Sequence, residues 1–260
     1  MYRVGVLTLQ GYRAWTDSIG NDREWIIQML QSGIYGLVAA EAASIGGHVI
    51  PLRYDYMLIL DPGFDQEGLR RIALSASSMS PARVLMSAAC SHTLLEAQAR
   101  ASADPGVYDS CIPDPLAVVH LDVNDISSRT PQESAYATFE YMMRMFCDVM
   151  NAAKSLGGLA QYLGGDNVAV FLPKGSLSKF MKYARELQGV KAGVGVHRSP
   201  REAMALAARA LRSLRALRAL SAQVRRSAWP AGERTGSRWR SSARTMNPLR
   251  TYMLRSTIGA

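Results

Sequence analysis

Two aspartates, Asp122 and Asp166, border apolar runs, and their residue type and spacing suit metal-assisted phosphoryl chemistry. Val118–Leu121 predicts a short buried strand with Asp122 at its carboxyl end. The Gly-Gly pair before Asp166 predicts a two-residue hairpin turn that leads into a second strand, Val168–Leu172. If these strands are neighbours, both carboxylates lie at one edge of a sheet. Hard oxygen ligands without Cys or His favour Mg²⁺, which can assist phosphoryl transfer.

Each aspartate alone also fits a plainer role, with Asp122 capping the next segment and Asp166 an ordinary turn residue. The pair favours a metal site, because both residues border apolar strands. His120 lies two residues before Asp122 on the same strand face and is a candidate general base. The other histidines are scattered along the chain, which predicts structural roles for them.

Five motifs occur together and in a fixed order. They are Tyr12–Thr16, Leu52–Asp55, His120–Asp125, Leu163–Asn167 and Lys191–Val196. The set resembles the GTP cyclohydrolase III family, whose members use Mg²⁺ to open the guanine ring of GTP. The strand-end aspartate and the Gly-Gly-Asp hairpin also resemble the palm domains of class III and GGDEF-type nucleotidyl cyclases. The resemblance covers residues 3–216.

This resemblance implies a defined reaction. Water attacks C8 of guanine, the imidazole ring opens with the formyl group retained, and the β and γ phosphates leave as two inorganic phosphates. The product, 2-amino-5-formylamino-6-(5-phosphoribosylamino)pyrimidin-4(3H)-one, leads toward flavin-type and deazaflavin-type cofactors. Asp122, Asp166 and the Val123 carbonyl would hold Mg²⁺ against the triphosphate. Asp122, Asp166 and His120 would be the catalytic residues.

Aromatic and charged residues of the first hundred positions are candidates for binding GTP. Tyr12 and Trp15 can stack on a purine, although aromatic residues at this spacing also anchor helices to a core. Arg53 is a candidate for contacting the triphosphate, with Asp55 assisting, although both also fit a purely structural hairpin.

Further candidates for binding GTP surround the two aspartates. Gly164 and Gly165 leave room for a phosphate to approach the backbone. Neighbouring Asn or Asp side chains can accept hydrogen bonds from N1 and N2 of guanine, and neither spacing nor residue type says which does so. These polar candidates are Asn124, Asp125 and Asn167.

The chain divides into two halves with similar patterns, each predicting a β-α-β-β-α-β-α unit. The strand Val4–Leu9 aligns with Val118–Leu121, which puts Gln10-Gly11 at the place of Asp122-Val123. The family resemblance implies Asp-Asn there, so Gln10 puts a metal ligand from the first half in doubt. The expected helices are Glu24–Ser44, Gln66–Ser77, Glu133–Leu156 and Ser176–Gln188, and capping boxes at Thr93–Glu96 and Ser199–Glu202 open one more in each half.

We therefore predict an α+β fold of two tandem ferredoxin-like, palm-type domains that arose by internal duplication. The first domain spans residues 1–103, a linker spans 104–115 and the second domain, with the metal carboxylates, spans 116–216. An irregular, Arg-rich tail, expected to be poorly ordered, spans 217–260.

The net charge of +9 belongs to the end of the chain. Residues 209–260 hold 12 arginines, no lysine and one acidic residue, which leaves the rest of the chain nearly neutral. Leucines recur every third position from Leu211 to Leu220, whereas a helix turns every 3.6 residues, so they drift off one face. Such a tail can bind nucleic acid phosphates or can be an extension without a role.

The cysteine spacing and the apolar runs of the sequence bear on the cellular compartment and on the choice of metal cofactor. Cys90, Cys111 and Cys147 are widely spaced, which argues against a disulfide framework and against a zinc site. No apolar run is long enough to span a membrane, and the N-terminus lacks a signal-peptide pattern. We expect a cytoplasmic protein that forms a homo-oligomer.

Two other functions remain open at this point. A palm-type nucleotidyl cyclase would release pyrophosphate, although Asn167-Val168 replaces the rest of the signature of a diguanylate cyclase. A non-enzymatic nucleotide or nucleic-acid binder would use the arginine-rich tail.

Overall fold

The computed structural model describes residues 1–63 and 66–227, with side chains described as far as residue 216. Met1–Leu211 form one compact unit, and a second unit begins at Arg212. Within the described ranges, none of the helices has the length and apolar character that a membrane span requires.

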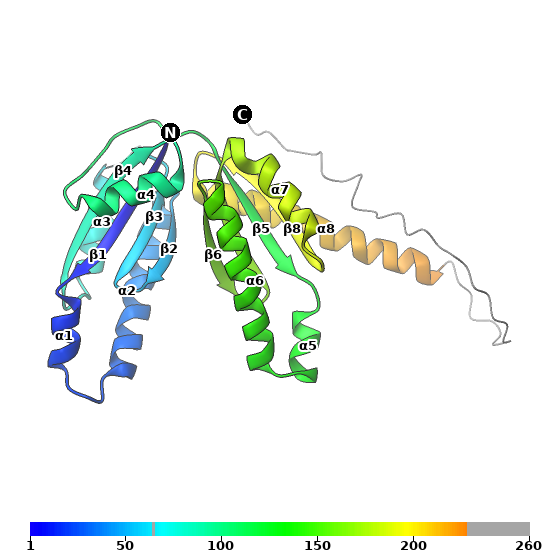
Figure 1. Ribbon diagram of the computed structural model, residues 1–260, viewed down its shortest axis with the longest axis horizontal. Coiled ribbons are helices and arrows are strands. Elements are labelled where there is room, and N and C mark those ends of the chain that lie inside the picture. Colours follow the sequence, from blue (N-terminus) through cyan, green and yellow to red (C-terminus); the bar gives the residue numbers. More distant parts are fainter. Residues whose placement is uncertain (64–65, 228–260) are drawn as a thin grey trace. The chain divides into compact units, whose positions relative to one another are not determined.

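The first unit contains two four-stranded antiparallel sheets, ordered β2-β3-β1-β4 and β6-β7-β5-β8 (Figure 1). The elements of the first half are β1 (Tyr2–Gln10), α1 (Tyr12–Ser18), α2 (Glu24–Ser44), β2 (His48–Arg53), β3 (Tyr56–Asp61), α3 (Gln66–Ser77), β4 (Arg83–Ser91) and α4 (Leu94–Ala103). Those of the second half are β5 (Leu116–Val123), α5 (Ile126–Gln132), α6 (Ala135–Ser155), β6 (Leu159–Gly164), β7 (Asn167–Pro173), the 3₁₀ turn η1 (Lys174–Ser176), α7 (Leu177–Glu186), β8 (Val190–His197) and α8 (Pro200–Ser227). The predicted α+β class is confirmed.

The helix predictions agree with the structure where local signals are strong. The bounds of α2 and α3 match the predicted ranges at both ends. The predicted helix Glu133–Leu156 begins too early, because the Ser134 hydroxyl accepts a hydrogen bond from Ala137 N and opens α6. The last helix, α8, continues to Ser227, although the second domain was predicted to end at residue 216. Its Ala, Leu and Arg residues all favour helix, a propensity that the leucine-spacing argument ignored.

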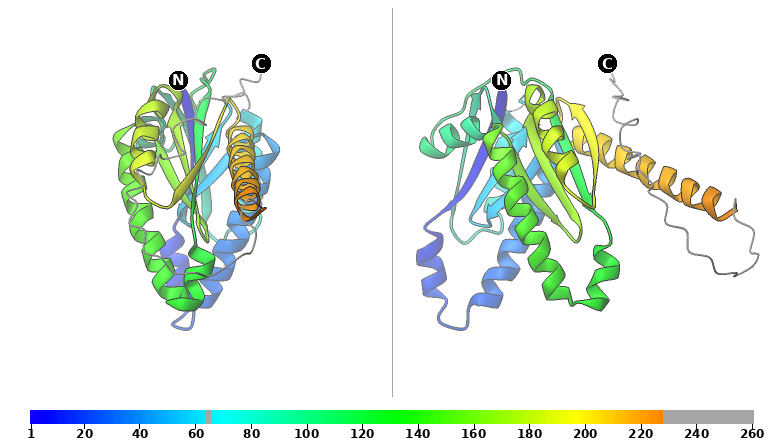
Figure 2. Two further views of the ribbon diagram at one scale, coloured as in Figure 1. Left: turned by 90° about the vertical axis from the view of Figure 1, so that its right-hand side faces the viewer. Right: turned by 45° about the vertical axis from the view of Figure 1, so that its right-hand side comes forward.

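Each sheet is covered on both faces. Apolar residues of α2 and α3 pack on one face of the first sheet, and those of α6 and α7 pack on one face of the second. The other two faces share a third cluster, to which α4 and α8 also contribute. Figure 2 shows the first turns of α8 on the opposite face of the second sheet from α6 and α7. The two halves therefore share one apolar layer, here called the inter-sheet core.

Two glycines of the Lys191–Val196 motif allow α8 to approach β8. A Cβ atom on Gly195 would lie 2.0 Å from the carbonyl oxygen of Ala203, and one on Gly193 would lie 2.2 Å from that of Ala207. Both distances are below any real contact, so larger residues would push the helix off the strand. The motif is thus explained in part by packing.

The last helix of each half also contacts the other half. Leu95 N, in the first turn of α4, donates to Gly157 O, and Arg201 N, in the first turn of α8, donates to Gly46 O. Both glycines have positive φ, 72° and 78°, just past the ends of α6 and α2. Half of each predicted capping box is confirmed, since the hydroxyls of Thr93 and Ser199 accept hydrogen bonds from Glu96 N and Glu202 N respectively. The backbone N–H of Ser199 donates to His197 Nδ1 rather than to Glu202.

Strand register corrects the expected correspondence between the halves. Asp122 pairs with Asn167, the first residue after the turn between β6 and β7. Thr8 pairs with Tyr56, the first residue after the turn between β2 and β3. Thr8, rather than Gln10, therefore occupies the position of Asp122. The sequence alignment was wrong because it ended the second strand at Leu121, whereas Val123 continues β5 into the core.

The expectation that the cysteines form no disulfide is wrong for one pair. Cys90 and Cys111 are bonded, with their Cα atoms 6.4 Å apart, and Cys147 is free and exposed. The linker turns back along β4, where Ala88 N donates to Val107 O and Asp109 N donates to Ala88 O. This return brings Cys111 beside Cys90, a proximity that a separation of 21 residues conceals.

Removing this disulfide is expected to lower the free energy of unfolding by about 3 kcal/mol, because the open chain regains the entropy of a loop of this length. Urea denaturation of Cys111→Ala under oxidising conditions measures the change. Cys147→Ala is the matched control and should unfold like the wild type. Equal midpoints for Cys111→Ala and the wild type would contradict the prediction.

Candidate active site

Asp122 lies near the carboxyl end of β5, with its side chain 2% exposed. Lys191 on β8 stands directly across the ladder, and its Nζ donates to Asp122 Oδ1 over 2.9 Å. Lys191 begins the Lys191–Val196 motif, but the sequence predicted no role for its side chain. Only its residue type could have indicated a role, because Lys191 and its partner Asp122 are 69 residues apart in the sequence.

Asp166 lies in the turn between β6 and β7, beside the end of β5. The predicted neighbourhood of the two strands is confirmed, since Asp122 pairs with Asn167 and Val123 N donates to Asp166 O over 2.9 Å. The central turn residues are Gly165 and Asp166, one position later than the predicted Gly-Gly pair, because Gly164 still pairs with Asn167. Gly165 has a φ of 59°, which glycine adopts without strain. The turn therefore holds Asp166 next to the strand that carries Asp122.

A chain of hydrogen bonds orients Asp166. Asn167 Nδ2 donates to Asp166 Oδ1 over 2.5 Å, and Asn167 Oδ1 lies 2.9 Å from His120 Nε2. Because the amide oxygen can only accept, His120 carries its proton on Nε2 and donates it. His120 thus positions Asn167, and through it Asp166, and its Nε2 does not act as a base in this arrangement.

The polar residues after β5 lie at the start of α5. Asn124 N donates to Gly189 O over 2.7 Å, and the Asn124 side chain is half-buried. Asp125 is exposed, has a φ of 65° and precedes the first residue of α5. Gly11 has a φ of 80° at the start of α1, so Asp125 and Gly11 occupy equivalent places. Both Asn124 and Asp125 therefore directly follow the strand that carries Asp122.

The candidates of the first half lie at the equivalent end of the first sheet. Arg53 Nη2 and Asp55 Oδ2 are 3.4 Å apart, and the Arg53 side chain is exposed. Tyr12 accepts a hydrogen bond from Gln31 at its hydroxyl and its ring centroid lies 5.3 Å from that of Trp15. Burial raises the pKa of Tyr12, and the charge of Asp55 adds to this increase. These contacts bring Tyr12 near both Trp15 and Asp55.

A family model described as GTP cyclohydrolase III matches residues 4–226. The chain belongs to this family. A GTP cyclohydrolase III of Aeropyrum pernix is 35% identical over 216 residues, which cover 80% of this chain and 90% of the relative. Proteins of the same name from Sulfurisphaera tokodaii and Pyrobaculum aerophilum are 31% and 30% identical, and cover 78% and 80% of this chain and 89% and 92% of their own lengths.

The GTP cyclohydrolase III match runs ten residues past residue 216, and it ends one residue before the end of α8. Residues 217–226 therefore belong to the family region, rather than to an unrelated tail. Among solved structures, a bacterial light-regulated adenylyl cyclase is 11% identical, with a TM-score of 0.31, and covers 80% of this chain and 82% of its own.

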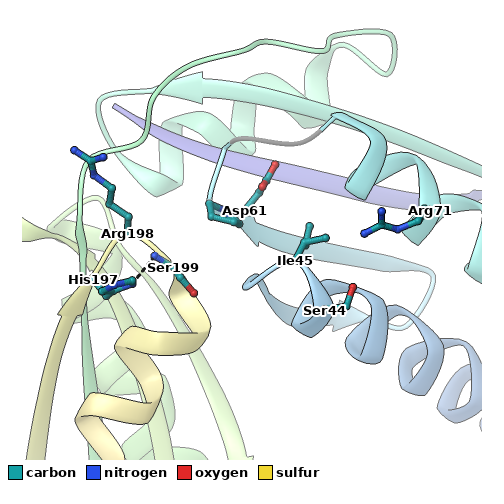
Figure 3. Close-up of a pocket in the computed structure, with 8 residues that line it drawn as sticks. Ser44, Ile45, Asp61, Arg71, His197, Arg198 and Ser199 are labelled. Carbon is teal, nitrogen blue, oxygen red and sulfur yellow. Dashed lines mark hydrogen bonds between the residues drawn. The ribbon is translucent and has the colours of Figure 1, made fainter.

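A pocket of about 540 Å³ in this member of the GTP cyclohydrolase III family is lined by residues of both halves (Figure 3). Its lining residues are Ser44, Ile45, Asp61, Pro62, Arg71, His197, Arg198 and Ser199. His197 pairs with Leu116 at the first residue of β5, whereas Asp122 lies near the last. The pocket is therefore at the opposite end of the strand from the candidate active site.

Proposed function

We propose that this chain is a GTP cyclohydrolase. It opens the imidazole ring of GTP, retains the formyl group and releases two inorganic phosphates, giving the formylamino-pyrimidine ribosylamino phosphate. The match to the GTP cyclohydrolase III family over residues 4–226 carries the proposal. The arrangement of Asp122 and Asp166 on neighbouring strands supports it.

Mg²⁺ is the cofactor in this proposal, held by Asp122, Asp166 and the Val123 carbonyl. These donors fit, since all are hard oxygens and a positive group already lies against Asp122. No group of three or more His, Cys, Asp or Glu side chains that could hold a metal ion occurs among the described residues. Substrate and water oxygens would complete the coordination, as is usual for Mg²⁺. Bound Mg²⁺ would supply Lewis-acid polarisation of the phosphate oxygens.

The other residues bind and orient the substrate. His120 and Asn167 hold Asp166 in place. Asn124, Asp125 and Asn167, which lie beside the two carboxylates, are proposed to read guanine. Gly164 and Gly165 allow the triphosphate to approach the hairpin backbone.

Residues of the first half complete the proposed site. Arg53 is proposed to contact the triphosphate beside Asp55, and Tyr12 and Trp15 are proposed to stack on the purine. The contact between the Tyr12 and Trp15 rings supports their acting together.

We also infer that the halves are palm-type domains that arose by duplication. Identical strand orders and the equivalent N-cap hydrogen bonds of Thr93 and Ser199 support this origin. The domains are proposed as residues 1–103 and 116–216, with the linker 104–115 between them and the basic segment 217–260 after them. Homo-oligomer formation and a cytoplasmic location stay predictions. Nucleic-acid binding by residues 217–260 falls on side chains outside the described part.

A mass analysis of GTP incubated with the protein and MgCl₂ tests the function. We expect a ring-opened, formylated nucleoside monophosphate product together with inorganic phosphate. Pyrophosphate with a cyclic or dimeric nucleotide would instead identify a nucleotidyl cyclase. Unchanged GTP would overturn the enzymatic proposal and favour a nucleotide binder.

A further inference from the structure

The ion pair between Lys191 and Asp122 suggests a role that the proposed chemistry does not yet use. The Asp122 side chain is 2% exposed and that of Lys191 is 17% exposed. A carboxylate removed from water in this way needs a cation close to it, because its desolvation is otherwise uncompensated. Lys191 supplies that cation from the neighbouring strand.

The pair occurs in the half that carries the proposed metal ligands. The register gives Thr8 and Leu85 as the equivalent cross-strand pair of the first sheet, and neither side chain is charged. Leu85 and Thr8 show that this position of the fold does not require an ion pair. We therefore relate the charge of Lys191 to the nearby carboxylates, because the sheet itself does not need it.

A divalent cation and the Lys191 ammonium compete for the same oxygen. A metal ion on Asp122 Oδ1 would lie within a few ångströms of Nζ, and like charges at that distance in a partly buried site repel strongly. The lysine stem has four rotatable carbons, so the ammonium can swing away without backbone movement. An ammonium is also an effective ligand for phosphate oxygens.

We propose that Lys191 holds the place of the divalent cation at Asp122 until the metal binds, and then moves to the triphosphate of the substrate. This inference rests on the proposed function, since it assumes that Asp122 is a metal ligand. Lys191 is accordingly a positioning residue in the metal-free protein and a phosphate-binding residue in the loaded one.

Titration with Mn²⁺ alone, followed by electron paramagnetic resonance, tests the first part of the proposal. Lys191→Met keeps the length of the side chain but removes its charge, and we expect it to bind Mn²⁺ at least about tenfold more tightly than the wild type. Lys191→Arg keeps the charge and should bind as the wild type does. Lys182→Met, which removes an exposed charge from α7, is the matched control and should change nothing.

Unchanged or weaker Mn²⁺ binding by Lys191→Met would overturn the proposal. If this variant is unstable without metal, thermal unfolding gives the same test, because MgCl₂ should then raise its Tm more than that of the wild type. An equal rise in both proteins contradicts the competition. The double variant with Asp122→Asn should show no rise.

GTP kinetics test whether Lys191 binds the triphosphate. They also distinguish a failure of this role from a failure of the proposed GTP cyclohydrolase activity. Lys191→Met should raise KM for GTP at least about tenfold, with a smaller change in kcat, if the ammonium binds the ground-state triphosphate. An unchanged KM overturns the phosphate-binding role. A wild type that leaves GTP intact refutes the proposed function, whereas the Mn²⁺ titration, which uses no GTP, still decides the competition.

Discussion

Asp166→Asn is expected to lower the turnover of GTP at least about 100-fold while the fold survives, because the substitution removes one of two carboxylates proposed to hold Mg²⁺. The side chain is half-buried at the tip of a hairpin, and asparagine keeps its size and its contact with Asn167. The loss should appear in kcat at saturating GTP and MgCl₂. Near-ultraviolet circular dichroism checks that the fold is retained.

Asp55→Asn is the matched comparison, because Asp55 stands at the equivalent turn of the first sheet. Leu9 N donates to Asp55 O as Val123 N donates to Asp166 O. Since Thr8 replaces the second carboxylate there, we expect Asp55→Asn to lower turnover less than about tenfold. Similar losses in both variants, or near-normal turnover of Asp166→Asn, would refute the metal assignment.

Arg3→Met is expected to lower the free energy of unfolding by about 3–5 kcal/mol, because it leaves the carboxylate of Asp61 buried without its cation. Arg3 Nη1 lies 3.0 Å from Asp61 Oδ2, and the two side chains are 1% and 0% exposed. Asp61 Oδ1 also accepts from Gly63 N, so the carboxylate is held at this place. Urea denaturation at constant pH measures the loss.

The double variant Arg3→Met with Asp61→Leu distinguishes the cost of losing the ion pair from the cost of leaving the Asp61 carboxylate buried without a cation. The equivalent cross-strand pair of the second sheet is Ala117 and Leu172, so this fold accepts apolar residues there. We expect the double variant to regain at least about half of the stability lost by Arg3→Met. A double variant no more stable than Arg3→Met would show that packing, rather than charge, sets the cost.

Local signals account for the parts of the fold and site that the sequence predicted. A glycine with positive φ, Gly46, follows α2, the Thr93 hydroxyl caps the start of α4, and apolar runs around tight turns mark the two hairpins. The neighbourhood of Asp122 and Asp166 was predicted on the condition that their strands pair, and β7 does pair with β5.

The parts that the sequence did not predict depend on contacts between distant segments. Lys191 reaches Asp122 only through the register of β5 with β8, and Cys111 reaches Cys90 only because the linker returns along β4. A one-residue change of register would move each side chain to the other face of the sheet, so residue type alone could not assign these partners. The hydrogen bonds by which His120 and Asn167 orient Asp166 also depend on the pairing of β5 with β7, so residue type alone did not predict them.

The shared inter-sheet core has a consequence for how the chain is made. Ala203 and Ala207 of α8 belong to the same apolar cluster as Val4 and Val6 of β1. During synthesis the first strand leaves the ribosome about 200 residues before its final partners do. The nascent first half therefore covers this face of its sheet with α4 alone, and its core is completed only when β5, β7 and finally α8 have been made.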